Sequence, residues 1–273
     1  MSAVGADADL LARIEEHFDA SPRSAADVEE HGALTLFVSR IPWRFYGRPR
    51  LGLAEDVGPD DVAAVRARQR ELGVHEAFEW VHETAPSLAG ATVAAGLQVL
   101  QVPLLALDEP QWAPPPTPDG IALRMLEPGD PSLPAAQAVV ELAFAAAGMA
   151  VGEAGTEARD RAVGKMGDLG FLRDRIRRGV TALAVAESEA DGPLGAGSHQ
   201  IVGAASEVMG VGTLPAARRR GIGAAVTGRL AQDARERGAE VVFLSAADDD
   251  VARSYERLGF RRIGTACFGF AAG

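Results

Sequence analysis

Cysteine and lysine are almost absent from this sequence. The 273 residues include one cysteine, Cys267, so an internal disulfide is excluded, and we expect a reducing, cytoplasmic location. Lysine occurs once, at Lys165, and arginine therefore carries nearly all of the positive charge. Histidine is also scarce, and His199 is the only one after residue 82. With so few histidines and cysteines, no metal site is expected.

Long apolar runs are missing as well, although 47 % of the residues are hydrophobic and can build a sizeable core. No run reaches the roughly 18 residues of a membrane span, so we expect no membrane partner. Acidic residues interrupt the first twenty positions, where a signal peptide would need an apolar stretch. The formal charge of −11 argues against nucleic acid as the main partner and is compatible with a cationic amine substrate.

A proline-rich stretch at residues 110–119 divides the chain. Such runs favour extended polyproline geometry and separate domains semi-rigidly. The sequence therefore predicts an N-terminal domain at 1–109, a linker at 110–119 and a second domain at 120–273.

The two domains share one order of elements near their ends. In the first, a helical segment ends at Gly73 and a second at Gly96; in the other, the corresponding helices end at Gly238 and Gly259. A strand lies between the helices each time, and an extended run follows, which indicates an internal repeat. Residues 53–58 of the first copy are acidic where the second copy carries arginines, so the first copy is expected to lack the chemistry of the second.

That chemistry centres on a basic glycine loop. A strand-like run at 208–214 stops at Pro215, and three arginines at 218–220 precede Gly221 and Gly223. The following segment has helical period, with apolar residues four apart on one face. The first turn of a helix offers unpaired N–H groups and partial positive charge, and arginine adds forked donors. A phosphate or diphosphate fits this combination.

The loop is neither a P-loop, because no Gly-Lys-Ser/Thr follows, nor a dinucleotide fingerprint, because Val226 stands at the third glycine position. It resembles the Arg/Gln-x-x-Gly-x-Gly/Ala loop of the GNAT superfamily of acyl-CoA N-acyltransferases. Glu207 on the preceding strand and the Tyr-x-x-x-Gly-Phe run from Tyr255 to Phe260 add to the resemblance. It implies an α/β (α+β) GNAT fold, with a mixed central sheet and flanking helices, preceded by a smaller degenerate GNAT-like half.

The resemblance also implies a coenzyme A site and no metal. The pantetheine arm would pair with the backbone at Val211, Gly212 and Thr213. The diphosphate would be held, mostly through backbone N–H groups, by Arg218, Arg219, Arg220, Gly221, Ile222, Gly223 and Ala224.

Two residues are candidates for catalysis. Glu207 is the expected general base, since amines are mostly protonated at neutral pH and must lose a proton before attack. Strand alternation would put it on one face with Met209 and Val211. Tyr255 is the expected general acid for the leaving thiolate. His199 is an alternative base, and Cys267 could in principle carry the acyl group.

We therefore expect an N-acetyltransferase that moves an acetyl group from acetyl-CoA to a primary amine by direct attack in a ternary complex. The acceptor, a small-molecule amine or a peptide N-terminus, is not fixed by the sequence, and neither is the choice between monomer and homodimer. The alternative is a non-catalytic module that binds acyl-CoA for sensing or regulation. Both need the loop, but only the enzyme needs Glu207 and Tyr255.

Overall fold

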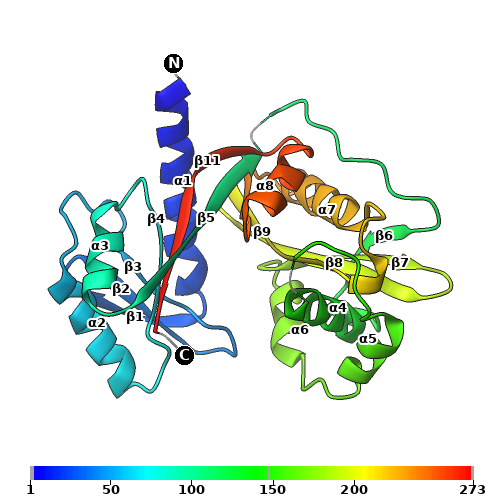
Figure 1. The fold of residues 1–273 in the computed structure, drawn as a ribbon, viewed down its shortest axis with the longest axis horizontal. Helices are drawn as coiled ribbons and strands as arrows, with labels where there is room; N and C mark the ends of the chain where they lie inside the picture. Colours follow the sequence, from blue (N-terminus) through cyan, green and yellow to red (C-terminus); the bar gives the residue numbers. More distant parts are fainter. Residues whose placement is uncertain (1–2, 108, 147, 272–273) are drawn as a thin grey trace. The chain divides into compact units, whose positions relative to one another are not determined.

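The computed structural model describes residues 3–107, 109–146 and 148–271. The chain forms two compact units that interleave in sequence (Figure 1). Unit 1 comprises Met1–Leu105, Ser245–Ala252 and Arg262–Gly273, and unit 2 comprises Ala106–Leu244 and Arg253–Arg261. The division at 1–109, 110–119 and 120–273 stays a prediction. Of the helices that the structure describes, none is long and apolar enough to cross a membrane.

Unit 1 contains a sheet with three helices. Its strands lie in the order β1-β2-β3-β4-β11-β5, with β3 parallel to β4 and β4 antiparallel to β11. Phe78, Trp80 and Leu88 are fully buried in its core. The elements are α1 (Ala3–Arg23), β1 (Ala26–His31), β2 (Leu34–Ser39), β3 (Gly47–Pro49), α2 (Pro59–Glu71), β4 (Ala77–Val81), α3 (Ser87–Ala94), the greater part of β5 (Gln98–Leu107), and β11 (Arg261–Phe270).

Unit 2 contains the predicted GNAT order. Its strands lie in the order β10-β9-β8-β7-β6, antiparallel except for the parallel pair β9 and β10. Figure 1 shows α7 on one face of these strands and α4, α5 and α6 on the other. The elements are β6 (Ala122–Met125), α4 (Leu133–Ala145), α5 (Thr156–Val163), α6 (Gly170–Arg177), β7 (Ala182–Ser188), β8 (Gly192–Val202), β9 (Ala205–Thr213), a 3-10 turn (Pro215–Ala217), α7 (Ile222–Glu236), β10 (Val241–Ser245) and the second half of α8 (Asp249–Glu256), whose first half belongs to unit 1.

The internal repeat is visible in the order of elements. Both copies run strand, helix, parallel strand, helix and strand: β3-α2-β4-α3-β5 in the first, and β9-α7-β10-α8-β11 in the second. Gly58 precedes α2 as Gly221 precedes α7. The mixed-sheet GNAT fold with a second, GNAT-like half, which the sequence predicted, is therefore confirmed.

Residues 1–30 have a helical pattern in the sequence, and a helix there is right up to Arg23 and wrong beyond it. Residues 26–31 form strand β1 rather than a continuation of the first helix. Their charged side chains do not give the pattern typical of a strand, but backbone pairing with β2 stabilises one. The polar stretch at 156–178, which the sequence indicates to be helical but interrupted by glycines, forms two helices, α5 and α6, separated by residues 164–169.

Candidate functional site

Glu207 stands where two parallel strands part. Within the described chain, the pairing of β10 with β9 covers three residue pairs and ends at Phe243 opposite Glu207. Beyond that point β9 continues to Thr213, and among the described residues it pairs with β8 alone. An extended, amide-bearing chain could therefore hydrogen-bond to the other edge of β9 from Val208 onward, like an added strand.

A bulge changes which side chains share a face with Glu207. The register between β8 and β9 shifts between Ala196 and Ser198, and Gly210 has a φ of +63°. A Cβ added at Gly197 would lie 3.0 Å from both Val211 Cγ2 and Leu230 Cδ1 of α7. Val211 therefore faces α7. The alternation that would align Val211 with Glu207 and Met209 fails because a bulge inserts one residue into the strand.

The basic loop has a backbone suited to an anion. Arg219 and Gly221 both have left-handed φ values, +66° and +78°, and left-handed residues in a tight turn orient successive N–H groups inward. The first hydrogen bond of α7 is from Ala225 N to Gly221 O at 3.0 Å. The N–H groups of Ile222, Gly223 and Ala224 therefore have no acceptor within the helix. A cradle of backbone donors results, at the positive end of a 15-residue helix.

The end of β9 lies directly beside this cradle. A Cβ added at Gly223 would be 3.4 Å from Thr213 Oγ1. The space for a side chain at Gly212 is even smaller, since an added Cβ would lie 2.7 Å from Ala143 Cβ of α4. Gly212 thus lets α4 approach the strand closely. The assignment of Val211, Gly212 and Thr213 to the pantetheine arm stays a prediction.

The three arginines of the loop differ in environment. The guanidinium of Arg218 donates to the carbonyls of Ala143, Ala146 and Ala150, at 2.8, 3.1 and 3.1 Å, and so satisfies the C-terminal end of α4. Arg219 and Arg220 are exposed. Sequence reasoning missed the structural task of Arg218, because its acceptors lie about seventy residues earlier in the chain.

Further contacts tie the loop to residues 148–155, here called the α4–α5 segment. Gly152 N donates to Pro215 O at 3.0 Å, and Ala216 N donates to Ala154 O at 3.1 Å. The same segment reaches the helix that carries Tyr255, because Ser254 Oγ lies 3.7 Å from Met149 Sδ. The structure therefore joins the basic loop and the end of α8 through one short segment.

Tyr255 is half-buried on the last turn of α8, with its ring 5.9 Å from that of Phe260 in an edge-on arrangement. Burial raises the pKa of its hydroxyl to about 12. Tyr255 is thus protonated at any physiological pH and can donate a hydrogen bond. Full proton transfer to a thiolate whose acid has a pKa of about 8.5 is uphill, so the hydroxyl suits stabilisation of a thiolate better than its complete protonation.

His199, the alternative base, is 1 % exposed and faces α7. Its Nδ1 lies 2.9 Å from Ser206 Oγ, and its Nε2 lies 2.8 Å from Asp233 Oδ2. Burial raises the pKa of Asp233, but hydrogen bonds from His199 and Arg237 outweigh that effect and hold it below its ordinary value. This buried network fixes α7 to β8 and β9. Both ring nitrogens are occupied there, so His199 is poorly suited to take a proton from a substrate.

We expect Asp233→Asn to destabilise the protein by about 2–3 kcal/mol, because charge-assisted hydrogen bonds to His199 and Arg237 are lost in a buried site. The melting temperature should fall by about 5–10 °C. Since the pKa of Asp233 is lowered on folding, its contribution is present above the unfolded pKa and is lost as the pH falls through the folded pKa. Exposed Glu236→Gln on the same helix is the matched control. Equal melting temperatures for both variants would contradict this account.

Cys267, the candidate acyl carrier, is fully buried in the core of unit 1. Burial raises the pKa of its thiol to about 11. A buried, protonated thiol is a poor nucleophile, so the arrangement disfavours an acyl-cysteine route.

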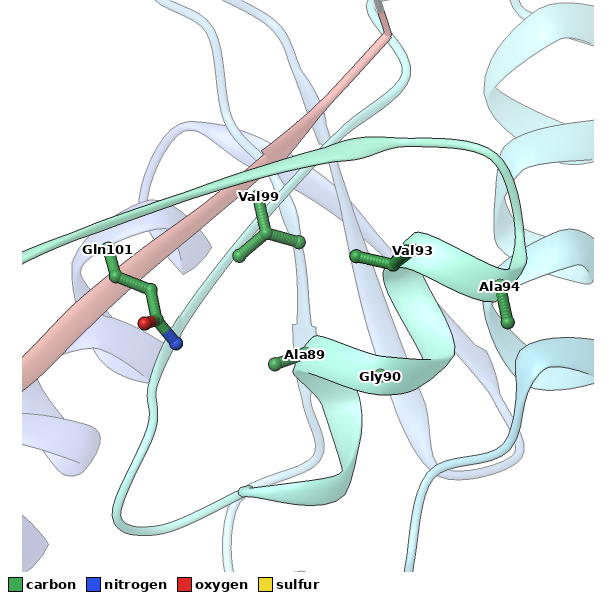
Figure 2. Close-up of a pocket in the computed structure, with 6 residues that line it drawn as sticks. All are labelled: Ala89, Gly90, Val93, Ala94, Val99 and Gln101. Carbon is green, nitrogen blue, oxygen red and sulfur yellow. The ribbon is translucent and has the colours of Figure 1, made fainter.

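The described residues contain no group of three or more His, Cys, Asp or Glu arranged to hold a metal ion. A groove of about 610 Å³ in unit 1 lies between α3 and β5 (Figure 2). It carries one amide and no titratable group; its lining is Ala89, Gly90, Val93, Ala94, Val99 and Gln101.

The first copy of the repeat lacks the anion cradle. Gly58 N, at the start of α2, donates to Asp61 Oδ2 at 2.9 Å, so the helix supplies its own carboxylate where a diphosphate would bind. Gly47 pairs with Phe78 as Glu207 pairs with Phe243, and an added Cβ at Gly47 would strike the Phe78 ring at 2.8 Å. The position of the candidate base is therefore occupied by a glycine that the packing requires.

Known proteins agree with this picture of the fold. Residues 199–268 match the family model described as FR47-like protein. The chain is similar to a solved GCN5-related N-acetyltransferase from Kribbella flavida, with 22 % identity over 96 % of each chain and a TM-score of 0.74. A tandem GNAT protein from the clavulanic acid biosynthesis pathway is 17 % identical over 98 % of this chain and 94 % of that one, with a TM-score of 0.58. Comparison with curated proteins gave no match.

These similarities extend over both halves, whereas the family model matches only the part that contains β9, the basic loop and α8. The chain thus has the fold of GNAT proteins over both of its halves, and its C-terminal part is similar to the FR47-like family.

Proposed function

We propose that the chain is an N-acetyltransferase that transfers an acetyl group from acetyl-CoA to a primary amine in a ternary complex. The observation that carries this proposal is the position of Glu207, at the last residue pair of the β9–β10 ladder. The donor cradle that begins at Gly221 lies beside the other end of β9, since a Cβ added at Gly223 would be 3.4 Å from Thr213 Oγ1. A coenzyme that binds the cradle by its diphosphate and extends along β9 would bring its thioester toward Glu207.

The residues then have distinct tasks. Glu207, directly or through a water, accepts a proton from the amine, whose nitrogen forms a bond to the thioester carbonyl carbon. A tetrahedral intermediate results, and its collapse breaks the carbon–sulfur bond. The sulfur leaves as a thiolate, to which the Tyr255 hydroxyl donates a hydrogen bond. The amine's protons pass to solvent through Glu207, the thiolate takes up one proton from solvent, and the products are the acetylated amine and coenzyme A.

Two experiments test the proposal together. Calorimetry should detect acetyl-CoA binding to the wild-type protein, and a thiol-release screen across small amines and peptide N-termini should find turnover. Binding without turnover on any acceptor would favour the non-catalytic acyl-CoA-binding module. If the wild-type protein does not bind acetyl-CoA, both the acetyltransferase and the acyl-CoA-binding module are excluded.

A further inference from the structure

We propose that the proline-rich stretch between the two halves is part of the catalytic machinery of unit 2, and that Trp112 positions the helix that carries Tyr255. This inference rests on the proposed function. The stretch, residues 109–118, is called the strap below. As a linker it was expected to act only as a spacer.

The strap lies along α7 at two glycines. A Cβ added at Gly228 would be 2.5 Å from Pro115 Cδ, and one at Gly221 would be 3.4 Å from Pro118 Cγ. Gly228 is buried in the middle of α7, and Gly221 precedes its first turn, where the donor cradle begins. The absence of a side chain at Gly228 therefore creates the seat that admits Pro115 to the helix surface.

Trp112 connects α7 to the end of α8. Its Nε1 donates to the carbonyl of Leu258 at 2.6 Å, and its Cδ1 would lie 2.9 Å from a Cβ added at Gly259. The guanidinium of Arg235, on α7, lies 5.3 Å from the Trp112 ring centroid and also donates to Glu109 O at 2.7 Å. The indole is thus held between a cation of one helix and the turn that ends the other.

This turn is the one that fixes Tyr255. The carbonyl of Tyr255 accepts from Leu258 N at 2.9 Å and from Phe260 N at 3.2 Å. A shift of Leu258 would therefore move the last turn of α8 and the tyrosine with it. Because a hydrogen-bond donor stabilises a transition state only when it is accurately placed, the strap should affect the chemical step more than cofactor binding.

The first test is Trp112→Phe, which keeps an aromatic ring for Arg235 and removes the donor to Leu258 together with part of the indole. We expect kcat to fall about 10-fold while KM for acetyl-CoA stays within about 2-fold, because the reacting groups are misplaced and the cradle is not. Asp119→Asn, at an exposed position just beyond the strap, is the control and should have wild-type kinetics.

The second test displaces the strap from the opposite side. Gly228→Ala puts a Cβ into Pro115 and should lower kcat to a similar extent, whereas Pro115→Ala in the same chain deletes Cγ and Cδ and should restore it to within about 2-fold. This rescue separates a positioning role from general destabilisation, which the second substitution would not repair.

The outcomes are distinct. An active wild type with unchanged kcat in both Trp112→Phe and Gly228→Ala overturns the positioning role and leaves the proposed function intact. A parallel loss of kcat, acetyl-CoA affinity and melting temperature without rescue by Pro115→Ala also overturns it. A wild type that neither binds nor turns over acetyl-CoA overturns the proposed function, and the inference with it.

Discussion

Replacing Glu207 by glutamine is expected to lower kcat at neutral pH by about 100-fold or more, the range typical of a lost general base. Glutamine has nearly the same size but cannot accept the amine's proton. Acetyl-CoA affinity, measured by calorimetry, should stay unchanged, because the cradle at Gly221 is not altered. The rate of the variant should also lose the acidic limb of the pH profile that reports deprotonation of Glu207.

Glu189→Gln is the matched control, since it makes the same chemical change on an exposed turn between β7 and β8. It should be kinetically silent. If Glu207→Gln keeps wild-type kcat and pH dependence, Glu207 is not the base, and the amine must lose its proton by another route.

A negative charge in the donor cradle is expected to weaken acetyl-CoA binding strongly. Ala224 is the third residue of α7, and its counterpart in α2 is Asp61, whose carboxylate accepts the N–H of Gly58. We expect Ala224→Asp to weaken acetyl-CoA binding about 100-fold or more, because a like charge then faces the diphosphate at its site. The variant would recreate in unit 2 the feature that blocks anion binding in unit 1.

The fold of this variant should not suffer, since an acidic residue in the first turn of a helix is favourable by about 0.3–1 kcal/mol. A melting temperature equal to or above that of the wild type, combined with lost binding, is the expected pattern. Ala224→Asn adds similar bulk without charge and should weaken binding much less. Wild-type affinity in Ala224→Asp would mean that the diphosphate does not bind at this helix.

Most of the elements could be predicted because their signals are local. The four-residue spacing of Ile222, Val226 and Leu230 indicated α7, and glycines marked its start and its end. The continuous apolar run of β10 indicated a strand buried on both faces. The acidic first turn of α2 was likewise visible in the sequence, and it predicts that the first copy repels a diphosphate.

The site was only partly predictable. Glu207 could be named as a candidate base from its spacing to the loop. The sequence could not predict that the pairing of β9 with β10 ends beside it, because that depends on the path of β10 in the folded chain. The bulge at Gly210 could not be predicted, because a single glycine in a strand does not by itself indicate a register shift. Asp233 was overlooked because a polar residue on a helix usually faces solvent, and only packing against His199 buries it.

The sequence alone determined the superfamily resemblance, the repeat and the chemistry that the loop supports, because each depends on residue types at fixed separations along the chain. Tertiary structure decided what distant residues do for one another. Arg218 satisfies the carbonyls at the end of α4, His199 is buried against Asp233, and Pro115 fits against Gly228. These contacts join segments that are far apart in sequence, and their partners become known only when the chain is folded.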